Sequence, residues 1–495
     1  MTVPRILAVD QGTSGTTSLV VGADGVVAGR GYAEVPVRYP RDGWVEQDPE
    51  DLWRSVLVAA RAALDAAGDP APVAVGITNQ RETAVLFERD GLAPVAPAIV
   101  WQCRRSAALC AAHRERGEED AVRARTGLLL DPYFTATKLE WLFAEQPGLR
   151  YRAERGRLCG GTVDTWLIAR MSGGSALVTD AGNASRTLLY DLASGTFGDD
   201  LCETFGVPAA LLAEIRPSAG RVAFTEPSEF LGLRLPISGI AGDQQAALFG
   251  QACLQPGMSK NTYGTGSFVV VNAGTSLPGP VDGLLRTVAW RLGGADTFAL
   301  EGSIFVTGAG ITWLRDGLGL ISAADEAGPL FDSVPDSNGC LFIPALSGLG
   351  APYWDPAARG ALVGLSAGVS RAHVVRAVVE AMAYRTRDVI EAIEAGSDID
   401  LRELRVDGGA SVMDGLCQFQ ADLLALPVTR AASVDSTAVG AAMLAAVGEG
   451  LVEAPGGVAA AYRAGRTFEP AQPGERPQAP YAAWLQAVAR VRGQL

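Results

Sequence analysis

The sequence is poor in histidine and has no paired cysteine motif. Only two histidines, His113 and His373, occur among 495 residues, so a histidine-based catalytic triad or a histidine-ligated metal has almost no candidates. The seven cysteines are an odd number without CxxC spacing, which favours buried thiols in a reducing compartment over disulfides or zinc ligands. We therefore expect the chemistry to depend on carboxylates and magnesium.

Positive charge and long apolar runs are scarce as well. The formal net charge of −14 repels a polyphosphate backbone, which argues against nucleic-acid binding by bulk electrostatics. No apolar stretch reaches the roughly 18 residues that cross a bilayer, and the apolar run at the N-terminus is too short for a signal peptide. We expect a soluble, cytoplasmic protein without a membrane partner.

The first half of the chain alternates strands and helices in the manner of an α/β domain. Asp48 and Pro49 are typical of a helix start and precede apolar residues at helical spacing, which predicts a helix of some four turns. Residues 23–25 supply turn chemistry for a hairpin within a three-strand meander. The predicted strands are 6–9, 18–21, 26–28, 73–77 and 98–101.

The pattern restarts near Gly250. Residues 262–272 repeat the order of residues 10–21, a Gly-Thr turn followed by a β-rich apolar run, which indicates a duplicated architecture. Ser370 is predicted to cap a long amphipathic helix, and residues 438–447 form a helix whose glycines and alanines permit close packing. The length fits two or three domains, and we place the boundary so that the domains are 1–250 and 251–495.

Three glycine-containing turns each follow or join a predicted strand, at Asp10–Thr17, Tyr263–Ser267 and Asp407–Ser411. Glycine lets backbone N–H groups approach phosphate oxygens, and neighbouring hydroxyls add donors. Taken singly, each turn is equally an ordinary tight loop. Two phosphate turns 250 residues apart would form a clamp if the two halves face each other. The GxxxxGK[ST] pattern of a P-loop is absent.

Polar side chains follow several of the predicted strands. Asp10 ends a strand beside the first turn and could hold Mg²⁺, although it could also cap the turn. Asp243 follows an apolar strand and a glycine, so it could accept a proton from an attacking hydroxyl, a contribution of roughly 10²- to 10⁴-fold. Arg81 and Glu82 follow the strand at 73–77, where an α/β fold opens its ligand crevice, and offer donors and acceptors to a polyol. An exposed ion pair is their structural alternative.

Eleven ordered motifs resemble the glycerol kinases of the FGGY carbohydrate kinase family from end to end. They include DQGT (10–13), GITNQRET (76–83), GTVDTWLI (161–168), PISGIAGDQQAALFGQ (236–251), KNTYGTGSF (260–268) and LRVDGG (404–409). The resemblance implies two α/β domains of the actin and hexokinase type, which is ribonuclease H-like, around a central cleft. It implies ATP-dependent, Mg²⁺-assisted phosphorylation of glycerol to sn-glycerol 3-phosphate by a homodimer or homotetramer.

The same resemblance assigns residues to roles. Asp243 is the implied base, and Asp10 and Asp243 are the implied magnesium positions. The implied glycerol contacts are Arg81, Glu82, Trp101, Tyr133, Asp243, Gln244 and Phe268. The implied nucleotide contacts are Thr13, Ser14, Gly264, Thr265, Gly308, Thr312, Gly409 and Met413.

Four positions depart from the family pattern, all on the nucleotide side. Gly15 replaces Ser, Thr17 replaces an Arg beside the phosphates, Thr312 replaces Gln and Met413 replaces Asn. A lost charge-assisted hydrogen bond costs about 1.5 to 3 kcal/mol in typical proteins. We therefore expect weaker or altered nucleotide binding and an unaltered choice of acceptor.

Three other functions are weighed against this one. The chain could be an FGGY kinase of another small polyol or ketose, which a substrate panel would reveal. It could be a non-catalytic relative that binds glycerol, which glycerol-dependent release of ADP would eliminate. An actin-like or Hsp70-like ATPase would hydrolyse ATP without a polyol and would leave the seven implied glycerol contacts unexplained.

Overall fold

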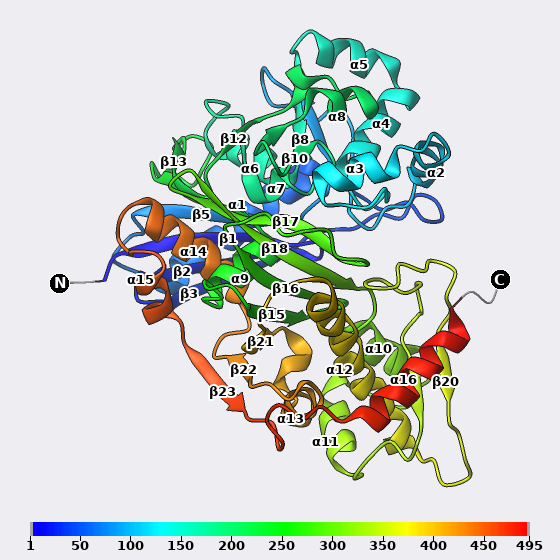
Figure 1. The fold of residues 1–495 in the computed structure, drawn as a ribbon. Coiled ribbons are helices and arrows are strands. Elements are labelled where there is room, and N and C mark those ends of the chain that lie inside the picture. The colour runs from blue at the N-terminus through cyan, green and yellow to red at the C-terminus, as the bar shows by residue number, and fades with distance from the viewer. Residues whose placement is uncertain (1–2, 493–495) are drawn as a thin grey trace.

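The computed structural model describes residues 3–492 and contains two large mixed sheets (Figure 1). In the six-stranded sheet, β1 pairs antiparallel with β2 and parallel with β5, and β5 pairs parallel with β14. The meander of three N-terminal strands is confirmed, with a third strand that begins at Val27 and is longer than expected. In sheet order the strands are β13 (Ala219–Phe224), β14 (Pro236–Gly242), β5 (Ala74–Asn79), β1 (Arg5–Gln11), β2 (Gly15–Gly22) and β3 (Val27–Glu34).

The seven-stranded sheet repeats this plan. Its central strand β15 pairs antiparallel with β16 and parallel with β21, as β1 pairs with β2 and β5, so the duplication indicated by residues 10–21 and 262–272 is confirmed. In sheet order its strands are β17 (Leu285–Leu292), β18 (Ala295–Ile304), β16 (Ser267–Gly274), β15 (Met258–Tyr263), β21 (Glu403–Asp407), β22 (Val428–Ala431) and β23 (Ala464–Phe468).

Helix α1 (Pro49–Ala67) packs against β2 and β3. Asp48 caps it by accepting a hydrogen bond from the backbone N–H of Glu50 at 3.0 Å, which satisfies one of the free donors at the helix start. The helix is longer than the four turns predicted. The long helix predicted after Ser370 is α12 (Arg371–Gly396), and its apolar face lies in the core of the C-terminal half.

Two helices pack closely against one another and against the sheets. Helix α9 (Asp243–Gly250) contacts strands of both sheets, and α14 (Ser436–Gly448) packs on α9 and on β14, β5 and β1. A Cβ on Gly440 would lie 1.8 Å from the carbonyl oxygen of Ala246, so only glycine allows this approach. The close packing predicted for residues 438–447 is confirmed, and it joins a helix of the C-terminal half to the N-terminal sheet.

The remaining helices and short strands lie around the two large sheets. Short helices α2 to α5 and α8 gather at the upper end of Figure 1, whereas α10 to α13 and α16 lie at the lower end. The helices are α2 (Ala107–Glu115), α3 (Glu119–Thr126), α4 (Thr135–Glu145), α5 (Pro147–Glu154), α6 (Val163–Met171), α7 (Ala181–Ala184), α8 (Asp199–Thr204), α10 (Gly308–Thr312), α11 (Ala327–Asp332), α13 (Asp414–Leu424), α15 (Gly456–Ala461) and α16 (Gln478–Val491). The short strands are β4 (Glu46–Gln47), β6 (Val85–Glu88), β7 (Ala98–Ile99), β8 (Leu158–Gly161), β9 (Val178–Asp180), β10 (Tyr190–Asp191), β11 (Thr196–Phe197), β12 (Glu214–Arg216), β19 (Leu341–Ile343) and β20 (Ala361–Val363).

The predicted strand 98–101 is only half right. Strand β7 ends at Ile99 because the chain turns there, with the N–H of Cys103 donating to the carbonyl of Val100 at 2.9 Å. All seven cysteines are buried and unpaired, as the spacing indicated. None of the helices within residues 3–492 is both long enough and apolar enough to cross a membrane.

Candidate active site

The two predicted phosphate turns follow the central strands of the two sheets. Thr13 and Ser14 lie between β1 and β2, and Gly264 and Thr265 lie between β15 and β16. The start of α10 contacts the second turn, since the N–H of Gly308 donates to the carbonyl of Gly264 at 2.9 Å. Ser14, Gly264 and Thr265 are exposed, so both turns lie at the protein surface.

Carboxylates from both halves face a common region beside these turns. Burial, together with the negative charges of Asp243, Asp435 and Asp407, raises the pKa of Asp10 to about 8. These acids come from the start of α9, the residue before α14 and the end of β21. Each of these charges disfavours ionisation of Asp10, and a bound cation would relieve that repulsion. The carboxyl ends of β1 and β21 therefore lie near each other.

The donor set fits magnesium. Mg²⁺ is usually held by one or two carboxylates, with water and substrate phosphates completing its shell, and Asp10 with Asp243 supplies such a pair. Within residues 3–492 no group of three His, Cys, Asp or Glu side chains is placed to hold a metal ion by itself. A Mg²⁺ ion that also binds substrate phosphates does not need such a group.

Arg81, Glu82 and Asp243 are brought together at the edge of this region. The Nε of Arg81 lies 3.1 Å from Oδ1 of Asp243 and 3.8 Å from Oε1 of Glu82. The side chains of Arg81 and Glu82 are buried, whereas that of Asp243 is 29% exposed. The alternative of an exposed ion pair is therefore wrong, because both residues lie beneath the carboxylate that remains accessible.

Sequence reasoning missed two further members of this cluster, Arg186 and Glu301. Arg186 donates through Nε to Glu82 at 2.6 Å and through Nη2 to Glu301 at 2.9 Å, and Arg81 donates to Glu301 at 2.5 and 3.1 Å. Burial alone would raise the pKa of Glu301, but Arg186 and Arg81 outweigh it and lower that pKa to about 2. A lone acid within the apolar run 298–304 was the available signal.

Three aromatic residues surround the cluster. The rings of Trp101 and Tyr133 meet edge to face with centroids 5.7 Å apart, and the guanidinium of Arg81 lies 5.6 Å from the ring centre of Phe268. Tyr133 is buried, and burial raises its pKa well above the usual value, so its phenol stays protonated and can donate or accept a hydrogen bond. Trp101 and Phe268 are half-buried and present apolar surface.

A network of buried amides connects the polyol side to the first phosphate turn. The side-chain amide of Gln80 donates to the side-chain oxygens of Gln11 at 3.1 Å and Gln47 at 2.9 Å. Gln47 donates to the carbonyl of Thr13 at 2.7 Å, and the indole of Trp101 donates to the Thr13 hydroxyl at 2.9 Å. The network fixes the turn relative to the segment after β5 that contains Arg81 and Glu82.

Gln244 and a lysine that sequence reasoning missed meet on the other side. Lys260 donates to Oε1 of Gln244 and, at 3.0 Å, to the hydroxyl of Thr262. Burial lowers the pKa of Lys260 to about 8, while Asp407 and Asp243 oppose that shift. Because Lys260 belongs to β15 and Gln244 to α9, this contact also joins the two halves.

The other predicted nucleotide positions lie in the C-terminal half. Gly409 follows β21 at an exposed position with open space where a Cβ would be. Thr312 at the end of α10 is exposed, and Met413 is half-buried against the core of this half. Neither side chain can supply the amide group that the family pattern has there.

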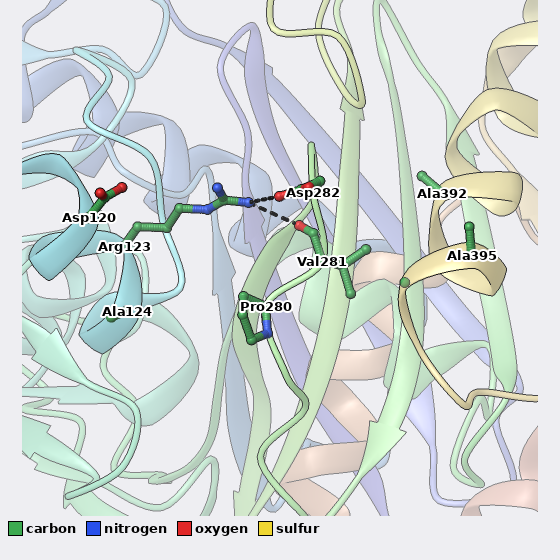
Figure 2. Close-up of a pocket in the computed structure, with 9 residues that line it drawn as sticks. Asp120, Arg123, Ala124, Pro280, Val281, Asp282, Ala392 and Ala395 are labelled. Carbon is green, nitrogen blue, oxygen red and sulfur yellow. Dashed lines mark hydrogen bonds and ion pairs between the residues drawn. The ribbon is translucent and has the colours of Figure 1, made fainter.

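A cavity of the molecule lies away from this region. It has a volume of about 570 Å³ and is lined by α3, residues 280–282 and the end of α12. Figure 2 shows Arg123 crossing it towards Val281 and Asp282, with Ala392 and Ala395 on the far wall. None of the predicted site residues lines this cavity. The cluster of charged residues around Asp243 is the candidate site because the reactive groups converge there.

Solved structures with the same fold are kinases. A glycerol kinase from Plasmodium falciparum with ADP superimposes with a TM-score of 0.91 at 28% identity, covering 100% of this chain and 99% of that one. A gluconate kinase from Lactobacillus acidophilus has a TM-score of 0.86 at 19% identity over 99% and 97% of the two chains. The fold is therefore the two-domain α/β fold of carbohydrate kinases.

The sequence comparisons identify the family. The N-terminal domain of the FGGY family of carbohydrate kinases matches residues 5–250, and its C-terminal domain matches residues 259–449. The chain belongs to this family. It is 50% identical over 487 residues to a glycerol kinase of Dechloromonas aromatica, covering 98% of this chain and 97% of that one. It is 46% identical over 495 residues to a glycerol kinase of Carboxydothermus hydrogenoformans, covering 99% of both.

Proposed function

We propose that this protein transfers the γ-phosphoryl group of ATP to glycerol and so forms sn-glycerol 3-phosphate and ADP. The observation that supports it best is the placement of Asp243, an accessible carboxylate 3.1 Å from Arg81 and beside Asp10. The names of the relatives at 46–50% identity point the same way. Residues 1–250 would bind the polyol and residues 251–495 the nucleotide.

In this proposal the residues of the polyol side have separate roles. Arg81, Glu82, Tyr133 and Gln244 hydrogen-bond the hydroxyls of glycerol, and Trp101 and Phe268 enclose its carbon chain. Asp243 accepts the proton of the terminal hydroxyl as its oxygen forms a bond to the γ-phosphorus in line with the departing ADP oxygen.

The phosphate side completes the arrangement. The turns at Thr13–Ser14 and Gly264–Thr265 would donate hydrogen bonds to the phosphates, with Gly308, Gly409, Thr312 and Met413 around the nucleotide. Mg²⁺ at Asp10 and Asp243 would neutralise charge on the phosphate oxygens. Because the two turns come from different sheets, closure of the halves would exclude water from the reacting phosphoryl group.

A steady-state assay of the full chain tests this function. We expect MgATP and glycerol to yield ADP and glycerol phosphate, with glycerol the best acceptor in a panel of trioses, tetritols, xylulose and gluconate. A better acceptor within that panel would move the assignment to another FGGY substrate. Hydrolysis of ATP at the same rate with and without any polyol would reject it altogether.

Replacing Thr17 by arginine tests the altered phosphate side. Thr17 lies opposite Asp10 in the β1–β2 ladder, so its side chain shares the face of Asp10. We expect Thr17→Arg to lower the KM for ATP about tenfold, because a guanidinium adds a charge-assisted hydrogen bond to phosphate. Thr17→Gln, which adds length without charge, is the matched control. Equal KM values in both variants would contradict the prediction.

A further inference from the structure

Glu301 is the single residue of the seven-stranded sheet within the buried ion cluster. It lies on β18, its side chain is fully buried, and it accepts hydrogen bonds from Arg81 and Arg186. Both arginines belong to the N-terminal half, Arg81 after β5 and Arg186 after α7. One carboxylate of the C-terminal half therefore holds two guanidiniums of the other half.

Glu301 holds both arginines, alongside Gln245 for Arg81 at 3.3 Å and Glu82 for Arg186 at 2.6 Å. Arg81 uses Nη1 and Nη2 on Glu301, at 2.5 and 3.1 Å, which leaves its Nε edge facing Asp243. That Nε is buried and makes no well-aligned hydrogen bond within residues 3–492, and the oxygen beside it is Oδ1 of Asp243 at 3.1 Å. A bidentate pair fixes the plane of a guanidinium as well as its position. The plane presented to the ligand is thus set from β18.

Arg186 connects Glu301 to Glu82. Its Nη2 is held by Glu301 at 2.9 Å, and its Nε holds Glu82 at 2.6 Å. Glu82 has a positive φ of 61°, a backbone conformation that needs support from its surroundings. The two arginines and two glutamates balance in charge. Removing the charge of Glu301 leaves two buried guanidiniums competing for Glu82 and Asp243.

We propose that Glu301 is a positioning residue that orients the polyol-binding groups Arg81 and Glu82 and ties them to the placement of the C-terminal sheet. It touches no substrate in this scheme and acts through the two arginines. The inference rests on the proposed function for the roles of Arg81 and Glu82. It adds that the affinity for the polyol depends on a buried carboxylate of the C-terminal sheet that does not touch the polyol.

The test compares Glu301→Gln with a matched variant of another buried carboxylate. Asp388 on α12 is also fully buried and pairs with Arg385 at 2.6 Å. Its hydrogen-bond partners are Arg385, Tyr481 and Trp484, so Asp388→Asn weakens a comparable buried ion pair without removing a contact of the polyol-binding groups. We expect Glu301→Gln to raise the KM for glycerol at least about tenfold, the loss from a misplaced charged hydrogen bond, with the KM for ATP little changed. Asp388→Asn should leave both KM values near wild type.

Two further measurements make every outcome decisive. Glycerol should raise the melting temperature of the wild type and of Asp388→Asn but not that of Glu301→Gln. This readout needs no turnover, so it separates the positioning role from a failure of the proposed reaction. If Glu301→Gln does not fold, Arg186→Lys is measured instead, because one ammonium cannot hold Glu82 and Glu301 in the bidentate manner of a guanidinium. A glycerol KM and a glycerol-induced melting shift equal to those of Asp388→Asn would overturn the proposal.

Discussion

Replacing Asp243 by asparagine is expected to lower kcat by about 10²- to 10⁴-fold, the contribution of a carboxylate base to proton transfer. Asparagine keeps the oxygen that accepts the N–H of Gln244 at 2.7 Å and has nearly the same volume, so the start of α9 should form as before. The side chain loses the ability to take a proton from the attacking hydroxyl. The rate of ADP formation at saturating glycerol and MgATP measures the effect.

The control for this variant is Asp282→Asn, because the Asp282 side chain is fully exposed and lies at the remote cavity. It removes the same negative charge from the chain and should leave kcat unchanged. The melting temperature of Asp243→Asn should stay close to that of the wild type, which excludes misfolding as the cause. A kcat within about a factor of three of wild type, which is under 1 kcal/mol in barrier height, would rule out Asp243 as the base.

Local sequence signals predicted most of the framework. The cap at Asp48, the restart of the pattern at residues 262–272 and the glycine-rich helix at 438–447 each depend on chemistry within a few residues. Strand 98–101 was overestimated because a run of apolar residues does not reveal where the chain leaves a ladder. Its last residue, Trp101, instead donates from its indole to Thr13, a contact that local pattern cannot predict.

The site was less predictable where it depends on long-range pairing. Arg81, Glu82 and Asp243 stand at strand ends, and the ends of parallel strands converge at one edge, so their proximity followed from the fold. Arg186 and Glu301 lie 115 positions apart; Arg186 falls within the family motif NASRTLLYDL (183–192), but that motif does not name its partner. Only the arrangement of the two sheets shows that each is the counterion of the other. The order of the elements along the chain does not predict such a cluster.

The same cluster gives the largest expected change in stability. Arg186→Leu should lower the free energy of unfolding by about 3–5 kcal/mol, the usual cost of leaving one member of a buried ion pair without its partner. Leucine fills part of the space but leaves Glu82 without its hydrogen-bonded cation and Glu301 with Arg81 alone. Urea denaturation at neutral pH measures this loss. Arg54→Leu, at a side chain that is 67% exposed, should change stability by less than about 1 kcal/mol.

The dependence of this loss on pH provides a second check. The pKa of Glu301 in the folded protein is about 2, below its ordinary 4.5, so its contribution is fully present above pH 4.5 and disappears as pH falls towards 2. Without Arg186 that depression of the pKa weakens, and burial, which already raises the pKa of Glu82, acts on both acids with less opposition. Both acids then bind protons more readily in the folded state of the variant. Lowering the pH therefore stabilises the folded variant relative to the folded wild type. The stability difference should therefore be greatest near neutral pH and shrink towards pH 4, and a difference that grows on acidification would show that Arg186 is not their counterion.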